Sequence, residues 1–135
     1  IFPVLNKATK AIIQDKKNKY LFQLRDNLKE ISSPNKWGFF GGKVIIGEKP
    51  SDCMIRELKE ELNIRTKVEK EYFQAINFDT NFLHFFFKVI TLDKVSENNL
   101  TEGQALGWFT IEQIKKKNMA WEVHKFIEFK NEKKV

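Results

Sequence analysis

The segment GKVIIGEKPSDCMIRELKEELNI, residues 42–64, constrains the fold more than any other part of the chain. Its apolar residues recur at helical spacing and predict an amphipathic helix from about Pro50 to Leu62. The adjoining polar side, a sector about 100° wide, carries three carboxylates. The apolar side is formed by Met54, Ile55, Leu58 and Leu62, and the carboxylates are Glu57, Glu60 and Glu61.

Three carboxylates on one side of a helix need a counterion. Like charges four residues apart, as at Glu57 and Glu61, destabilise a helix by roughly 0.2–0.5 kcal/mol. A divalent cation removes this repulsion, and carboxylate oxygens are ligands that suit Mg²⁺ or Mn²⁺. The helix is therefore predicted to hold Mg²⁺ (or Mn²⁺).

The spacing of the fixed residues around this helix resembles the signature of the Nudix hydrolases, and of its MutT-type members in particular. The signature's last glycine is replaced by Asn63, just past the helix, where a left-handed residue is often needed and Asn is tolerated next best after Gly. All other positions match: Gly42, Glu48, Arg56, Glu57, Leu58, Glu60, Glu61 and Ile64.

The rest of the chain predicts strands before and after the helix. Apolar alternation and turn residues indicate strands over 7–14 and 19–25, joined as a hairpin, and a second hairpin over 67–78 and 82–92. Short strands are expected at 37–40 and 105–109, and helices at 111–117 and 119–129. The phenylalanine run at 85–87 suggests burial on both faces of its strand. This order predicts an α+β or α/β protein, and the resemblance implies an α/β/α sandwich with a mixed β-sheet.

Composition places further limits on the molecule. A chain of 135 residues is expected to form one domain spanning 1–135. The single cysteine, Cys53, excludes an internal disulfide and fits a cytoplasmic location; it is expected to pack as a buried thiol. No apolar run approaches the ~20 residues of a membrane span. The net charge of +6 favours a polyanionic partner such as a nucleotide, but no continuous basic stripe predicts binding to extended nucleic acid.

The resemblance implies roles for the residues of the signature. The metal is expected to be ligated by Glu57, Glu60, Glu61 and the carbonyl of Gly41. Glu57 and Glu60 are also expected to take part in catalysis, and Glu57 is alternatively the general base that deprotonates the attacking water. Arg56 is expected to orient the catalytic carboxylate. Gly42 and Glu48 are grouped with the substrate-binding part of the site. Both glycines also have a physical reason to be glycine, because the backbone there must turn sharply near ions or phosphate.

Four residues outside the signature are weighed against ordinary structural roles. Glu102, in a Glu-Gly-Gln sequence ahead of Trp108, resembles the MutT-type residue that supplies a further metal ligand or the base; a solvated loop acid is the alternative, and Glu97 competes for the role. Arg25 closes a strand at the place where MutT-type members carry an arginine that contacts substrate, and Gln23 alternates with it along the strand. The alternative is that both side chains simply face solvent. His84 could read a nucleobase or serve as a structural histidine.

The predicted function is Mg²⁺-dependent hydrolysis of a diphosphate bond in a nucleoside diphosphate linked to another moiety. The partner is then a nucleotide or nucleotide derivative, and the protein a monomer or homodimer. One alternative is a catalytically silent Nudix-fold sensor that binds a nucleotide, although such modules often lose a helix glutamate. Another is an isoprenoid diphosphate isomerase of the same fold, which needs an active-site cysteine.

Overall fold

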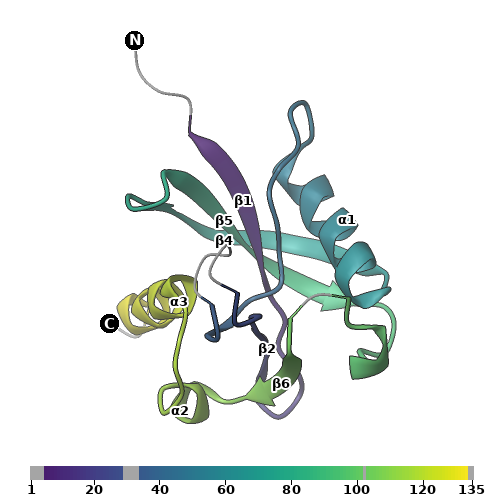
Figure 1. The fold of residues 1–135 in the computed structure, drawn as a ribbon, viewed down its shortest axis with the longest axis vertical. Coiled ribbons are helices and arrows are strands. Elements are labelled where there is room, and N and C mark those ends of the chain that lie inside the picture. Colours follow the sequence, from purple (N-terminus) through teal and green to yellow (C-terminus); the bar gives the residue numbers. More distant parts are fainter. Residues whose placement is uncertain (1–4, 29–33, 102, 134–135) are drawn as a thin grey trace.

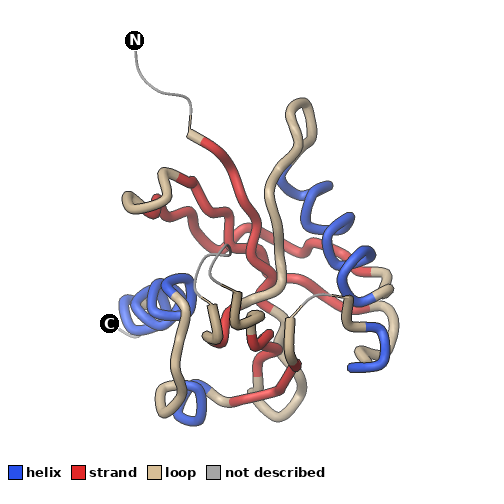
Figure 2. Tube along the Cα trace, viewed as in Figure 1, coloured by secondary structure: helices blue, strands red, loops and turns tan. Residues whose placement is uncertain are grey.

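The computed structural model describes residues 5–28, 34–101 and 103–133, and its helices lie on either side of a set of β-strands (Figures 1 and 2). Helix α1 covers one face of the strands and α3 the other (Figure 1). This arrangement is the expected α/β/α sandwich. In chain order the elements are β1 (Asn6–Ile12), β2 (Tyr20–Leu24), β3 (Trp37–Gly38), α1 (Pro50–Leu62), β4 (Thr66–Asn77), β5 (Phe82–Thr91), the 3₁₀ turn η1 (Glu97–Asn99), β6 (Ala105–Phe109), α2 (Ile111–Ile114) and α3 (Trp121–Glu132).

The strands of the described residues form two three-stranded sheets. In the first, of order β1-β5-β4, strand β1 runs parallel to β5 and β4 runs antiparallel to it. This sheet is mixed, as expected, and the predicted hairpin of β4 and β5 is confirmed. The second sheet, of order β3-β2-β6, is antiparallel throughout.

The predicted hairpin over 7–14 and 19–25 is correct only at its turn. The Asp15 carboxylate accepts hydrogen bonds from the backbone N–H groups of Lys17 and Lys19, and Gln14 forms a bridge with Tyr20. Beyond this turn the two segments separate, because β1 pairs with β5, whereas β2 pairs with β3 and β6. The turn therefore joins two sheets instead of closing a long hairpin.

Strand β3 and helix α3 are both shorter than the sequence predicts, since β3 ends at Gly38 instead of residue 40 and α3 begins at Trp121 instead of residue 119. Trp37 donates its N–H to the carbonyl of Asn118, and the Ala120 N–H donates to the carbonyl of Trp37. Met119 and Ala120, which are expected to form the start of the last helix, instead lie in extended chain that is hydrogen-bonded to β3. Helix α3 consequently starts at Trp121.

Two apolar cores lie on the two faces of the β1-β5-β4 sheet. Phe85 and Phe87 pack with α1, whereas Phe86 packs with Phe126 of α3. All three phenylalanines of the run are buried, which confirms burial on both faces. Of the expected apolar side of α1, only Ile55 differs, since it is 40% exposed.

Asn63 ends α1 in the left-handed conformation that the sequence predicts. Its φ is 52° and its ψ 41°, and its N–H donates to the carbonyl of Lys59 at 3.0 Å. Asn is one of the few non-glycine residues that adopt this conformation at low cost.

Replacing Asn63 with alanine should therefore lower the free energy of unfolding by about 1 kcal/mol, whereas Asn63→Gly should leave it unchanged or raise it slightly. Urea denaturation of the two variants measures the difference. Equal stability of the alanine and glycine variants would show that the left-handed backbone at Asn63 is not what limits this position.

Candidate active site

Arg56 on α1 connects the charged residues of the signature. Its guanidinium donates to both carboxylate oxygens of Glu48, at 2.8 and 3.0 Å. Nη1 also donates to Glu57 at 3.1 Å and to Glu60 at 3.2 Å, and Nη2 donates to the carbonyl of Lys43 at 3.2 Å. The hydrogen bonds from Arg56 hold the pKa of Glu48 down at about 2. Arg56 therefore fixes one oxygen of Glu57 relative to the loop that follows the glycine pair.

The backbone of Gly41 and Gly42 lies directly between β1 and α1. The Thr9 N–H donates to the carbonyl of Gly42 at 2.9 Å. A Cβ on Gly41 would stand 1.8 Å from the Thr9 carbonyl oxygen, and a Cβ on Gly42 would stand 2.2 Å from the carboxyl carbon of Glu57. At Gly41 only glycine fits, because the clash is with backbone, and at Gly42 the absence of a side chain lets the Glu57 carboxylate approach the main chain.

The three glutamates of the helix lie in different environments. The Glu57 side chain is 15% exposed and that of Glu60 58%, whereas Glu61 is buried at 3%. No group of three or more His, Cys, Asp or Glu side chains in the described ranges stands close enough together to form a metal site in this arrangement. Arg56 draws Glu57 and Glu60 to itself, as a guanidinium does when it is the nearest cation.

The donor set nevertheless fits a divalent cation. Carboxylate and carbonyl oxygens are the ligands that Mg²⁺ takes, and Glu57 lies in the space that a side chain on Gly42 would fill. Glu61 is a buried carboxylate on the same helix. Burying a carboxylate costs free energy unless a partner such as a metal ion compensates its charge.

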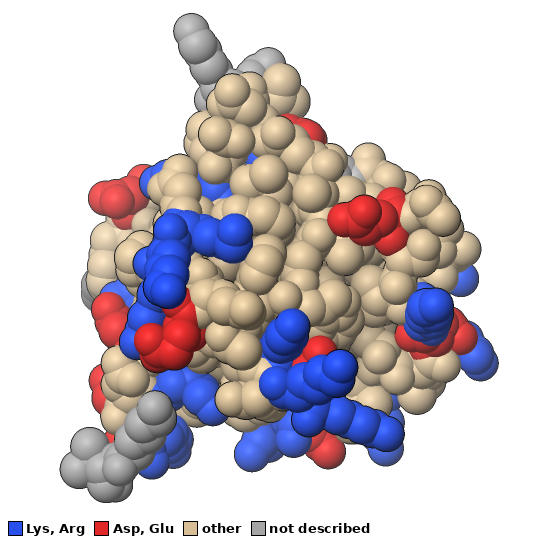
Figure 3. All heavy atoms as spheres, turned by 90° about the horizontal axis from the view of Figure 1, so that it is seen from below, with Lys and Arg blue, Asp and Glu red and all other residues tan. Residues whose placement is uncertain are grey.

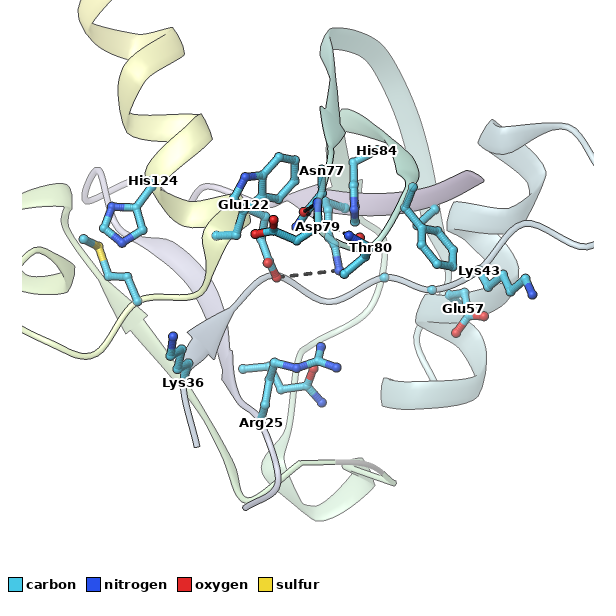
Figure 4. Close-up of a pocket in the computed structure, with 18 residues that line it drawn as sticks. Arg25, Lys36, Lys43, Glu57, Asn77, Asp79, Thr80, His84, Glu122 and His124 are labelled. Carbon is cyan, nitrogen blue, oxygen red and sulfur yellow. Dashed lines mark hydrogen bonds and ion pairs between the residues drawn. The ribbon is translucent and has the colours of Figure 1, made fainter. Parts of the chain in front are cut away.

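A pocket of about 880 Å³ opens beside this helix and the glycine pair (Figure 4). Glu57 and Lys43 lie at one end, His124 and Lys36 lie at the other, and Glu122 and His84 lie between them (Figure 4). Its size is that of pockets that enclose a nucleotide-sized molecule. Four lysine and arginine side chains line it, which suits an anionic ligand: Lys10, Arg25, Lys36 and Lys43.

The pocket brings together six of the residues singled out in the sequence: Gln23, Arg25, Gly41, Gly42, Glu57 and His84. The predicted positions Glu48, Arg56, Glu60 and Glu61 are not in its lining, and the first two form the ion pair described above. Glu102 lies outside the described residues. Thr101 beside it donates its N–H to the carbonyl of Glu61, which ties this loop to the end of α1.

Sequence reasoning missed Lys10, Trp121 and Glu122, which line the pocket from β1 and α3. For Lys10 and Glu122 the available signal was a single charged residue inside a mainly apolar stretch, as in Ala8 to Ile13 and Met119 to Val123. Lys10 is 8% exposed and Glu122 5%. Charged residues are seldom buried without a partner, so both positions could have been marked for attention.

His84 is buried in the pocket wall, 4.9 Å from the ring centroid of Trp121. Among the described residues no group hydrogen-bonds to its Nδ1. Burial, followed by the nearby Lys10 ammonium, lowers the pKa of His84 to about 4. The imidazole is therefore neutral at pH 7 and acts as a weakly polar part of the wall.

This lowered pKa predicts a loss of stability in acid. Between pH 6.5, the pKa of an unfolded histidine, and the lower pKa in the folded protein, His84 is protonated in the unfolded chain but not in the folded one. The free energy of unfolding therefore falls as the pH falls through this range, by roughly 3 kcal/mol at most. Urea denaturation between pH 7.5 and pH 4.5 should show a shallower loss for His84→Gln than for the unmodified protein. His124→Gln, an exposed change on α3, is the control, and identical pH slopes for the two variants would contradict the assignment.

Cys53 packs beneath the glycine pair as the sequence predicts. Its thiol is buried and lies 3.5 Å from the carbonyl of Lys43. Burial outweighs the hydrogen bond with Thr9 and raises the pKa of Cys53 to about 11. A buried, protonated thiol outside the pocket lining is not placed to act on a ligand.

Charged side chains on the surface lie in separate groups. Figure 3 shows Lys and Arg side chains on the face seen from below, with acidic residues among them and uncharged surface between the groups. None of the helices in the described part of the chain is long and apolar enough to cross a membrane.

Comparisons with known proteins agree with this geometry. The NUDIX domain family model matches residues 4–129. The fold is similar to a MutT protein from Methanosarcina mazei Go1 (22% identity, TM-score 0.78, 96% of each chain covered) and to a Nudix hydrolase from Nitrosomonas europaea (20%, 0.76, 95% of this chain and 89% of that one). It is also similar to an ADP-ribose pyrophosphatase from Streptococcus suis (19%, 0.63, 81% of this chain and 76% of that one). No curated protein matches the sequence.

The chain therefore belongs to the Nudix family, as a Nudix hydrolase that acts on phosphoanhydride bonds. Proteins of this family generally use divalent metal cations.

Proposed function

We propose that the protein hydrolyses a diphosphate bond in a nucleoside diphosphate linked to another moiety, with Mg²⁺ or Mn²⁺ as its cofactor. The observation that carries this proposal is the position of Glu57. This carboxylate lines the pocket, packs against Gly42 and receives a hydrogen bond from Arg56. A carboxylate, a glycine backbone and a cationic pocket thus meet at one place.

Each residue has a distinct part in the proposed site. Glu57, Glu60, Glu61 and the carbonyl of Gly41 would hold the metal, which when bound neutralises the diphosphate and activates water. Glu57, which lines the pocket, would take a proton from the attacking water. Arg56 is a positioning residue that orients Glu57 and pairs with Glu48. Glu102 is proposed as a further ligand or base, with Glu97 as its competitor.

The cationic residues of the pocket would bind the phosphates. Gln23 lies on β2 and Arg25 directly follows it, and both line the pocket. Lys43 lies beside Glu57 (Figure 4). Phosphoryl transfer depends mainly on positioning and on neutralising charge, and lysine and arginine side chains provide both. The ADP-ribose pyrophosphatase among the structural neighbours has a substrate of this chemical class by its name.

A phosphate-release screen tests this function. Nucleoside triphosphates, nucleotide sugars, ADP-ribose and dinucleoside polyphosphates are each incubated with the protein in Mg²⁺ and in EDTA. We expect turnover of at least one class in Mg²⁺ and none in EDTA. Calorimetric binding of a nucleotide without phosphate release from any of these compounds would instead identify a nucleotide sensor.

A further inference from the structure

A buried ion pair lines the middle of the pocket, away from the glutamates of α1 (Figure 4). The Lys10 ammonium lies 3.6 Å from Oε2 of Glu122, with side-chain exposures of 10% and 7%. Figure 4 marks this contact with a dashed line. The two residues come from β1 and α3, so the pair joins the sheet to the last helix.

The surrounding backbone is built around the Glu122 carboxylate. The Phe39 N–H donates to Oε2 at 3.3 Å. A Cβ on Gly38 would stand 2.5 Å from the same oxygen, so the absence of a side chain on Gly38 makes room for it. Burial is the largest single influence and opposes ionisation, but the Lys10 ammonium, the backbone N–H of Glu122 itself and the Arg25 guanidinium together hold the pKa of Glu122 below its ordinary value. The carboxylate therefore accepts hydrogen bonds and donates none.

A buried ion pair is a poor way to gain stability. Two apolar side chains of similar volume serve a core equally well or better, because both charges lose their hydration. The pair nevertheless lies at the wall of a pocket large enough for a nucleotide, where both charged groups can meet a ligand. A carboxylate has about four acceptor positions and an ammonium three donors, so each group can bind the protein, as in the contacts above, and a ligand at the same time.

The neighbouring side chains suit a flat aromatic ring. Trp121 and His84 line the same pocket as this pair, with their ring centroids 4.9 Å apart, and His84 is neutral. Stacking on such rings binds nucleobases without selecting among them. Selection requires hydrogen bonds to the base edge, for which Lys10 and Glu122 are the buried charged groups present.

We propose that Lys10 and Glu122 select nucleobases that carry a carbonyl beside a ring N–H, as in hypoxanthine, guanine and uracil. The carbonyl accepts from Lys10 and the ring N–H donates to Glu122. Adenine and cytosine present an amino group beside a ring nitrogen, an edge that neutral Asn and Gln side chains read better than charged ones, whereas lysine favours a carbonyl oxygen. This inference rests on the proposed function, because it places the nucleoside part of that substrate here.

Matched nucleoside monophosphates test the selection without any hydrolysis. Inosine and adenosine monophosphates differ only at the base edge in question, and uridine and cytidine monophosphates form a second pair. Titration calorimetry in EDTA should give a dissociation constant about tenfold or more lower for the inosine and uridine compounds, as expected for one well-placed pair of hydrogen bonds.

Glu122→Gln should reduce each ratio to less than about twofold, because the amide both donates and accepts. Glu128→Gln, an exposed change on the same helix, should retain the full ratio. If the Lys10 charge left unpaired by Glu122→Gln unfolds the protein, the double variant Lys10→Met/Glu122→Gln removes both charges and should also lose the preference.

The outcomes distinguish failure of the base selection by Lys10 and Glu122 from failure of the proposed hydrolase function. Nucleotides that are hydrolysed without any base preference, or a preference that survives Glu122→Gln, would overturn the selection while leaving the proposed function intact. A preference for adenosine and cytidine monophosphates would overturn it as well. Absence of both nucleotide binding and phosphate release would overturn the two proposals together.

Discussion

Replacing Glu57 with glutamine should lower kcat at saturating Mg²⁺ by about a thousandfold or more. The amide cannot accept a proton from water and is a weaker metal ligand, and each loss alone is typically worth two orders of magnitude or more. The fold should persist, because the amide oxygen can still accept the hydrogen bond that Arg56 donates at 3.1 Å. Steady-state phosphate release and a urea denaturation curve separate the loss of activity from a loss of stability.

Glu69→Gln is the control for this experiment. Glu69 lies on β4 in an exposed ion pair with Lys88, so its replacement should change kcat less than twofold. A Glu57→Gln protein that retains more than about a tenth of the normal kcat would show that this carboxylate is neither the base nor an essential ligand.

Replacing Arg56 with lysine should lower kcat by about a hundredfold. A lysine keeps the charge but cannot reproduce the planar set of donors that contacts Glu48, Glu57 and the Lys43 carbonyl at once. Misplacement of a catalytic group by about 1 Å costs this much in rate. The half-saturating Mg²⁺ concentration should rise as well, since Glu57 and Glu60 lose the side chain that orients them.

Arg65→Lys is a matched control for this change. Arg65 forms a comparable forked ion pair with Asp93, at 2.8 Å, but it is exposed and follows the end of α1. Its replacement should leave kcat and the Mg²⁺ dependence unchanged. Equal effects of Arg56→Lys and Arg65→Lys would indicate that Arg56 contributes only as a surface ion pair.

Local patterns in the sequence predict what local physics decides. Helix α1 has the bounds expected from its apolar spacing, and Asn63 adopts the left-handed conformation that a helix end requires. The buried run at Phe85 to Phe87 likewise follows from the unbroken hydrophobicity of that strand. In each case the chain within a few residues determines the structure.

Features that depend on distant partners were not predictable in this way. The 15–18 turn joins two different sheets because β5 and β6, much later in the chain, compete for its two strands. The Lys10–Glu122 pair brings together β1 and α3. A sequence pattern indicates that a residue is unusual in its surroundings, but it does not indicate which distant residue will meet it.

The site also combines features that local sequence predicts with features that depend on distant partners. The signature predicts Glu57 beside a glycine pair, and the structure places its carboxylate against Gly42. The pocket that would receive the rest of a substrate is built largely from residues outside the signature, including Lys36, Trp121 and His124. A family signature thus predicts the residues proposed for the chemistry, whereas substrate selection depends on the tertiary arrangement of the other elements.

The most direct test of the central claim is product analysis after turnover in ¹⁸O-labelled water. With Mg²⁺ and a substrate identified by the phosphate-release screen, we predict that mass spectrometry finds the label on a phosphate group of one product, and that EDTA abolishes product formation. Label on a carbon-bound hydroxyl, unlabelled products, or undiminished turnover in EDTA would contradict a metal-assisted attack of water on phosphorus.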